Sequence, residues 1–261
     1  MSYAVRAEGL VRRYGDTVAL DGFDLAVRPG EVVALLGPQG AGRTTALRVL
    51  AALDRPDAGR ATVCGHDVVR EGARVRELIW GMEWPAGGRE AGHLLGSPRV
   101  LLLDEPDAGL LWNVVRHRAA EGTAVLFTTR HPAEADGLAD RVAVLDGGRV
   151  VAEGPPEELK RRLGEPSLRV RPSLAGDGDA VRRILTELTG TVPSHDRHTG
   201  LFSAPAADPM LLSALVRRLE RAGIGTEEVG LRRPDLEEVV TALTAGTGPV
   251  RPRYPAVPRT R

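Results

Sequence analysis

The segment Gly37-Pro38-Gln39-Gly40-Ala41-Gly42-Arg43-Thr44 is the most informative motif of this 261-residue chain. It follows the apolar run 31–36 and precedes a helical pattern at 44–53. Its three glycines let backbone N–H groups turn inward without Cβ clashes, and the helix N-terminus adds unpaired N–H donors. A strand, a glycine-rich loop and a helix in this order are typical of a phosphate-binding loop. A glycine-rich turn that holds no ligand is the less favoured interpretation.

One position of this loop departs from the usual pattern, in which a lysine precedes the serine or threonine. Arg43 stands in that place. Lysine carries a compact ammonium and arginine a wider planar fork, so the exchange is not conservative. Because the charge is kept, we expect affinity for phosphates to survive and catalytic positioning to suffer. The Thr44 hydroxyl is placed to ligate Mg²⁺ beside the phosphates.

A second motif, Val100-Leu101-Leu102-Leu103-Asp104-Glu105-Pro106, places two carboxylates after an apolar run. Open α/β sheets bind their ligands at the carboxyl ends of the strands. We expect Asp104 to hold Mg²⁺ through water and Glu105 to orient or deprotonate an attacking water. Alone, the motif is as typical of a salt-bridged strand end. The phosphate loop upstream favours the catalytic interpretation.

The pattern of residues 1–164 predicts an α/β domain, because apolar runs alternate with helical segments. Two of these runs, 32–36 and 100–103, lack polar alternation, which is typical of parallel strands covered on both faces. Further strands are expected at 18–27, 60–64, 124–128, 141–145 and 149–152, and further helices at 110–120, 133–138 and 156–163.

Residues 165–245 form a second alternating unit. A strand at 168–171, a helix at 180–188 and a hairpin over 191–204 are followed by a helix at 211–222, a strand at 227–231 and a short helix from Pro234. The order βαββαβ predicts a small ferredoxin-like α+β domain. Residues 246–261 are rich in proline and arginine, and we expect a disordered, solvated tail there rather than a binding segment.

The composition of the chain argues against several classes of function. The 35 basic residues balance the 35 acidic ones, and a neutral chain lacks the basic footprint that nucleic-acid binding requires. A single cysteine excludes an internal disulfide and suits a reducing cytoplasm. No apolar run approaches the roughly 18 residues of a membrane span. We therefore expect a soluble protein that binds no nucleic acid and reaches a membrane only through a partner.

With these motifs, the chain resembles the ATP-binding subunits of ABC transporters. The turn 28–31, the pair Thr128-Thr129, the segment 134–136 and the hairpin 146–150 match elements of that family. The segment Leu231-Arg232-Arg233-Pro234-Asp235-Leu236-Glu237-Glu238-Val239 is similar to the end of the extra domain in the daunorubicin/doxorubicin-resistance type. The resemblance covers roughly residues 3 to 245.

The resemblance implies an ATPase that binds ATP and Mg²⁺, forms a homodimer and acts on a separate integral-membrane permease. The chain would then be cytoplasmic and peripheral on the inner face of the cell membrane. Tyr14 matches the aromatic residue that stacks on adenine, although a packing role is about as common for a lone tyrosine there. The implied nucleotide-binding residues are Tyr14, Gly37, Pro38, Gln39, Gly40, Ala41, Gly42, Arg43, Thr44 and Thr45. The implied catalytic residues are Glu105, Arg130 and His131, and the implied metal ligands are Thr44 and Asp104.

The span between the two motifs departs most from the family. Arg43 and Asp104 are only 61 positions apart (104 − 43), too few for the family's Gln-bearing loop and complete helical subdomain. Residues 78–98 must replace most of that subdomain. Within them, 85–90 resemble a remnant of the signature, with Ala86 in its serine position.

Two further motifs are only partly kept. After Asp-Glu-Pro, Leu111 and Trp112 fill the positions of an Asp and a Pro that bridge the family's dimer. Arg130 occupies the position of the switch histidine, and His131 follows it. An arginine can still contact a γ-phosphate as a cation, whereas it cannot act as a neutral imidazole. A solvated loop histidine is the simpler interpretation of His131.

All three tryptophans, Trp80, Trp84 and Trp112, lie in or beside the shortened span. Trp80 and Trp84 would share a face if a helix forms there. They are expected to cover core that the shortening leaves bare, and contact with a membrane partner is the alternative.

Two functions are compatible with these motifs. In the first, the chain couples ATP binding and hydrolysis to export of a drug-like or lipid-like substrate through a separate permease. In the second, it is a degenerate subunit that binds nucleotide with little or no hydrolysis, because the departures gather at contacts with the γ-phosphate and the dimer partner. A P-loop protein outside the ABC family explains the outer motifs poorly.

Overall fold

The computed structural model describes residues 3–81, 98–106, 108–206 and 208–244. They form two compact units: one runs to Leu159 and resumes at Leu236, and the other spans Lys160–Asp235. The expected boundary at 164/165 lies near this division. The last helix, α8 (Leu236–Thr244), was expected in the second unit but packs with the first, because its Leu236 and Val239 are buried in a core there.

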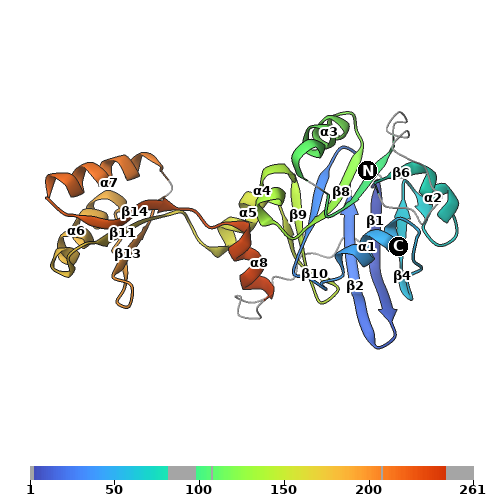
Figure 1. Ribbon diagram of the computed structural model, residues 1–261, viewed down its shortest axis with the longest axis horizontal. Coiled ribbons are helices and arrows are strands. Elements are labelled where there is room, and N and C mark those ends of the chain that lie inside the picture. The colour runs from blue at the N-terminus through green and yellow to red at the C-terminus, as the bar shows by residue number, and fades with distance from the viewer. Residues whose placement is uncertain (1–2, 82–97, 107, 207, 245–261) are drawn as a thin grey trace. The chain divides into compact units, whose positions relative to one another are not determined.

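The first unit is built on a six-stranded sheet (Figure 1). Across the sheet the strands are β10 (Arg149–Gly154), β9 (Arg141–Asp146), β3 (Val32–Leu36), β8 (Ala124–Thr129), β7 (Val100–Asp104) and β6 (Ile79–Trp80). Strand β10 pairs antiparallel with β9, and the other neighbours are parallel. The parallel α/β domain predicted from the sequence is therefore the one observed.

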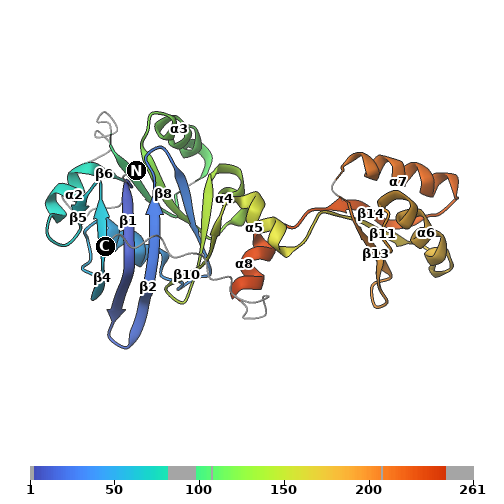
Figure 2. The ribbon, with the colours of Figure 1, turned by 180° about the vertical axis from the view of Figure 1, so that it is seen from behind.

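Helices and a second sheet cover the two faces of this sheet. The helices are α1 (Arg43–Leu50), α2 (Gly72–Leu78), α3 (Ala108–Ala120), α4 (Pro132–Leu138) and α5 (Pro156–Leu163). Val33 and Leu35 of β3 face a core shared with α1, while Val32, Ala34 and Leu36 face a core that includes side chains of α3, α4, α5 and α8. Seen from both sides in Figures 1 and 2, α8 lies beside α4, with which it is in contact.

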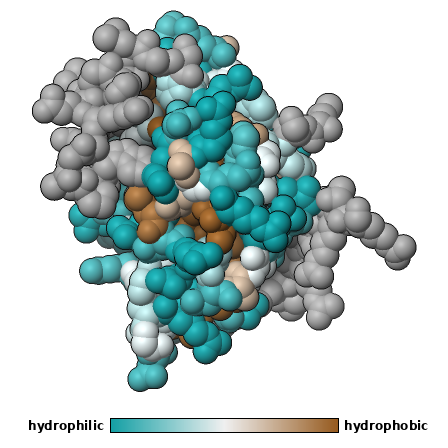
Figure 3. All heavy atoms as spheres, turned by 90° about the vertical axis from the view of Figure 1, so that its right-hand side faces the viewer, coloured by the Kyte–Doolittle hydropathy of each residue, from teal (hydrophilic) through white to brown (hydrophobic). Residues whose placement is uncertain are grey.

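The antiparallel sheet has the order β2-β1-β4-β5 and contains β1 (Val5–Tyr14), β2 (Thr17–Val27), β4 (Ala58–Val63) and β5 (His66–Asp67). The sequence predicted neither β1 nor β5. Strand β1 was missed because Gly9 and the register shift between Ala7 and Leu10 break its alternation. On the face that carries α2, apolar surface gathers in the middle and hydrophilic side chains surround it (Figure 3).

Two of the tryptophans pack against the core that includes side chains of α3, α4, α5 and α8. Trp80 lies in strand β6, not in a helix, and Trp112 meets Phe127 edge to face with ring centroids 5.6 Å apart. Both are partly buried against this core, which confirms the covering role expected for them. Trp84, Ala86 and the predicted signature remnant at 85–90 lie outside the described residues.

The second unit places two helices on one antiparallel sheet. Its elements are β11 (Ser167–Pro172), α6 (Gly178–Thr189), β12 (Ser194–Asp196), β13 (Leu201–Pro205), α7 (Met210–Arg221) and β14 (Thr226–Arg232). The strand order β12-β13-β11-β14 and the chain order βαββαβ are those of a ferredoxin-like layer. Leu168 and Val170 of the sheet pack with Val181, Leu185 and Leu215 of the helices.

The turn before β3 is fixed by an ion pair. Glu31 accepts hydrogen bonds from the Arg28 N–H at 2.8 Å and from the Arg141 guanidinium at 2.7 and 3.1 Å. Arg141 also contacts the carbonyl of Ala26 and the carboxylate of Glu153. Burial raises the pKa of Glu31, but the Arg141 and Arg28 hydrogen bonds outweigh it, so this pKa lies below its ordinary value. The pair joins β9 to the strand that delivers the phosphate loop.

Replacing Glu31 with Gln is expected to lower the free energy of unfolding by about 2 kcal/mol at pH 7, because charge-assisted hydrogen bonds are lost. A carboxyl group whose pKa is lower in the folded than in the unfolded protein stabilises the fold at pH values above its unfolded pKa. This stabilisation is lost as the pH falls through the folded pKa. The deficit in urea denaturation should therefore shrink in acid. Glu77→Gln, which removes an exposed partner of Arg74, is the control, and an equal loss in both variants would contradict this role of Glu31.

Candidate functional site

The two sequence motifs meet at one edge of the parallel sheet. The loop 37–42 leaves the carboxyl end of β3 and enters α1, while Asp104 and Thr129 end the neighbouring strands β7 and β8. Parallel strands present their carboxyl ends on the same side, which is where open α/β sheets bind ligands. The predicted site is thus assembled by the topology of the sheet.

Close backbone packing holds the loop in shape. A Cβ atom on Gly37 would lie 2.3 Å from the Leu145 carbonyl oxygen, and one on Gly42 would lie 2.2 Å from that of Ala19. The N–H of Gly148 donates to the Ala41 carbonyl at 3.0 Å. Gly40 has φ +81° and faces open space. The loop therefore keeps an accessible backbone at Gly40, as a phosphate cradle requires.

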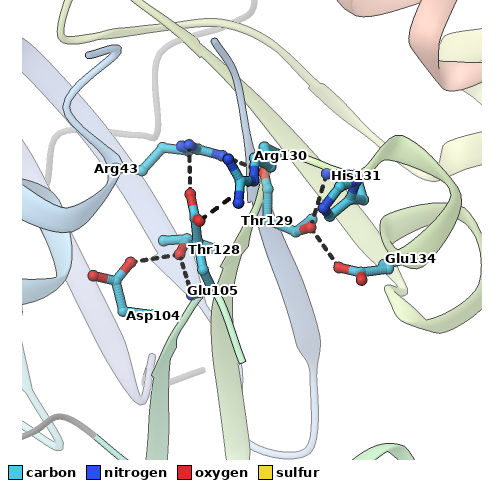
Figure 4. Close-up of polar contacts among 8 residues, drawn as sticks. All are labelled: Arg43, Asp104, Glu105, Thr128, Thr129, Arg130, His131 and Glu134. Atoms are coloured by element: carbon cyan, nitrogen blue, oxygen red, sulfur yellow. Dashed lines mark hydrogen bonds and ion pairs between the residues drawn. The ribbon is translucent and has the colours of Figure 1, made fainter. Parts of the chain in front are cut away.

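Arg43 links three elements of the site (Figure 4). Its side chain is 7% exposed. One Nη atom donates to the Thr129 carbonyl at 2.5 Å, and the other donates to Glu105 Oε1 at 2.8 Å. The planar fork thus ties the start of α1 to the ends of β7 and β8, which a single ammonium cannot do in the same way.

Thr128 orders the two carboxylates of the second motif. Its hydroxyl donates to Asp104 Oδ1 at 2.6 Å and accepts from the Glu105 N–H at 2.9 Å. Glu105 has φ +42°, in the left-handed region that a side chain rarely adopts. Sequence analysis did not count Thr128 as a site residue; its signal was a hydroxyl at the end of an otherwise apolar strand beside β7.

Residues 130–134, which follow β8, contribute one cation to this cluster. Arg130, 67% exposed, has its Nε 3.7 Å from Glu105 Oε2. The His131 N–H donates to Thr129 Oγ1 at 2.9 Å, and this hydroxyl donates to Glu134 Oε2 at 2.5 Å. The imidazole of His131 is exposed at the start of α4. Arg43, Asp104, Glu105 and Arg130 are therefore brought together, whereas His131 takes part through its backbone.

The other predicted residues surround the loop. Thr44 is exposed in the first turn of α1, Thr45 is half-buried beside it, and Pro38 and Gln39 are exposed in the loop. Tyr14 lies at the end of β1, outside the parallel sheet. Leu111 lies among the side chains that are not described.

The residues present fit a magnesium nucleotide. Among the described residues, no group of three or more His, Cys, Asp or Glu side chains is placed to hold a metal ion. Mg²⁺ in nucleotide sites binds one or two protein oxygens, waters and phosphates. Thr44 and Asp104 supply a hydroxyl and a half-buried carboxylate at the same edge of the sheet, while the loop offers backbone donors to phosphates.

Comparisons with known proteins find relatives that cover most of this chain. A family model described as "ABC transporter" matches residues 20–82. The daunorubicin resistance ATP-binding protein DrrA3 of Streptomyces coeruleorubidus is 40% identical over 305 positions, covering 92% of this chain and 96% of the relative. The daunorubicin/doxorubicin resistance ATP-binding protein DrrA of Streptomyces peucetius is 34% identical, with 92% of each chain covered. The first alignment is longer than this chain, so that relative has residues within the matched region that this chain lacks.

Solved structures show the same fold. An ATP-binding subunit of an ABC transporter superposes with a TM-score of 0.52 at 18% identity, covering 61% of this chain and 93% of that structure. CbiO1 from Clostridium perfringens, part of an ABC transporter complex, superposes with a TM-score of 0.52 at 23% identity, covering 61% and 91%.

Proposed function

Because this chain belongs to the ABC transporter ATP-binding subunits of the daunorubicin/doxorubicin-resistance type, we propose that it hydrolyses ATP to drive export of a drug-like or lipid-like substrate through a separate membrane permease. The names of the relatives, which concern daunorubicin and doxorubicin resistance, support the drug-like class. The observation that carries the proposal is the meeting of Arg43, Asp104 and Glu105 at the carboxyl ends of the parallel strands.

Each of these residues has a task in the proposed reaction. Bound Mg²⁺ supplies charge neutralisation on the phosphates. Thr44 and Asp104 hold the ion, the latter through water, and the loop N–H groups hold the phosphates. Glu105 orients an attacking water and accepts its proton, and Arg130 lies beside this carboxylate as a cation for the developing charge. Because Thr128 holds the backbone of Glu105, the base is positioned before substrate arrives.

The permease and a second copy of this chain complete the proposed assembly. None of the described helices is long and apolar enough to cross a membrane. We propose that export uses a separate membrane-spanning permease, as in exporters of this family, with this chain on its cytoplasmic side. A homodimer is proposed because the family sandwiches its nucleotides between two such subunits.

The purified chain, alone and in vesicles with its permease, tests this function. ATP binding with turnover well above that of Glu105→Gln, and ATP-dependent drug uptake into inside-out vesicles, are the expected results. Binding with turnover no greater than that of Glu105→Gln would instead establish the degenerate subunit. If the chain binds no ATP, both the ATPase and the degenerate nucleotide-binding subunit are excluded.

The metal site gives a separate prediction. Asp104→Asn is expected to raise the Mg²⁺ concentration for half-maximal turnover at least tenfold, because outer-sphere carboxylates contribute that much to metal affinity. The asparagine carbonyl still accepts from Thr128, so the network in Figure 4 is retained. Turnover is titrated with Mg²⁺ at fixed ATP, and chelation with EDTA should abolish it. An unchanged titration would show that Asp104 does not hold the ion.

A further inference from the structure

Tyr14 makes contacts that the sequence motifs do not account for. Its hydroxyl donates to Asp54 Oδ2 at 2.5 Å. The guanidinium carbon of Arg12 lies 4.7 Å from the centroid of its ring, within the range of a cation–π contact. The residue is nevertheless 44% exposed. The hydroxyl and one face of the ring are thus held in place while part of its surface stays accessible.

Asp54 is itself fixed to α1. Its side chain is 15% exposed and accepts from Arg48 Nε at 2.9 Å and Nη2 at 3.2 Å. Its backbone N–H donates to the Arg48 carbonyl at 3.2 Å. The hydrogen bonds from Arg48 and Tyr14 hold the pKa of the Asp54 carboxyl below its ordinary value. The acceptor of the Tyr14 hydroxyl is therefore a charged, immobilised group at neutral pH.

This arrangement connects Tyr14 to the phosphate loop. Helix α1 begins at the loop with Arg43, and Arg48 is five residues farther, about 7.5 Å along the helix axis. The loop also packs against β2, since a Cβ atom on Gly42 would lie 2.2 Å from the Ala19 carbonyl oxygen, and Thr17 of the same strand pairs with Tyr14. Hydrogen bonds from Arg48 to Asp54 and from Tyr14 to Asp54 thus hold the Tyr14 ring beside the last turn of α1. The phosphate loop lies at the other end of this helix.

We propose that Asp54 is a positioning residue that holds Tyr14 as the stacking platform for the adenine base, with Arg12 against the opposite face of the ring. This inference rests on the proposed nucleotide binding. A ring whose hydroxyl is anchored loses little conformational freedom when a base stacks on it, and such preorganisation strengthens binding. Since Arg12 covers one face, the base has one side on which to stack.

Equilibrium binding of Mg-ATP and of magnesium tripolyphosphate to the full chain tests the inference. Tripolyphosphate presents the phosphates without a base. Asp54→Asn weakens the anchor, and Tyr14→Phe removes the hydroxyl while leaving the Asp54–Arg48 pair intact. Glu77→Gln is the control, because Glu77 is an exposed partner of Arg74 and bonds neither Tyr14 nor Arg12.

Asp54→Asn and Tyr14→Phe are each expected to weaken ATP binding by roughly fivefold through lost preorganisation, with tripolyphosphate binding unchanged and Glu77→Gln like wild type. Equal weakening for both ligands would assign Asp54 a structural role in α1 and overturn the inference, as would unchanged ATP affinity in Tyr14→Phe. A wild-type chain that binds neither ligand contradicts the proposed function itself, whereas wild-type binding with unaffected variants contradicts only the role of Asp54.

Discussion

Replacing Glu105 with Gln is expected to lower ATP turnover by about 100- to 10,000-fold, the range that a positioned general base contributes. Glutamine keeps the size of the side chain and an oxygen for Arg43, but it cannot accept a proton from water. The Thr128 hydroxyl still receives the backbone N–H of residue 105, so the loop geometry should be retained. The loss should therefore appear in kcat and not in ATP affinity.

Turnover at saturating Mg-ATP and equilibrium binding of ATP measure the two quantities separately. Glu121→Gln, which removes an exposed carboxylate at the end of α3, is the control and should match wild type. Turnover of Glu105→Gln within a few-fold of wild type would exclude Glu105 as the base. In that case Glu134, which accepts from Thr129 in the same region, is the next carboxylate to replace.

The sequence predicted those parts of the site that depend on local order along the chain. A loop between a strand and a helix, and two carboxylates at the end of an apolar strand, are placed by the parallel sheet itself. Their convergence follows once β3, β8 and β7 are neighbours. The predicted strands 32–36 and 100–103 therefore carried most of the information about the site.

Contacts between distant segments could not be predicted in this way. Thr128 meets Asp104 because β7 and β8 pair in one register, and the sequence does not specify that register. Tyr14 at the end of β1 meets Asp54 in the bend after α1, with no spacing rule between them. Helix α8 packs with the first unit although the residues before it in the sequence lie in the second. This packing could not be predicted, because only the completed core shows where Leu236 and Val239 are buried.

The role of Arg43 likewise depends on its conformation and not only on its charge. A cation in the lysine position is expected to face the phosphates, yet here the guanidinium contacts Thr129 and Glu105. Glu105 is 42% exposed, so water screens this pair and its contribution to stability is small. Its consequence is geometric, since a carboxylate oxygen that is bonded to Arg43 is not available to a water molecule.

Replacing Arg43 with Met is expected to weaken ATP binding about 100-fold, because charge-assisted hydrogen bonds to phosphate are lost. Arg43→Lys is expected to keep ATP affinity within about threefold of wild type, since the ammonium still pairs with phosphates. Equilibrium binding measures both variants, and thermal unfolding of the nucleotide-free chain confirms that they fold. Arg43→Met with wild-type affinity would show that the nucleotide does not use this side chain.

The lysine variant also separates affinity from catalysis. A single ammonium cannot bond the Thr129 carbonyl and Glu105 in the manner of the arginine fork, so Glu105 is freer to act on water when phosphates are bound. Arg43→Lys should therefore raise kcat by about fivefold at unchanged ATP affinity, equivalent to roughly 1 kcal/mol of barrier. The same substitution in a Glu105→Gln background should have no such effect, because the base is absent. An equal rise in both backgrounds would show that Arg43 restrains turnover by a route other than its contact with Glu105.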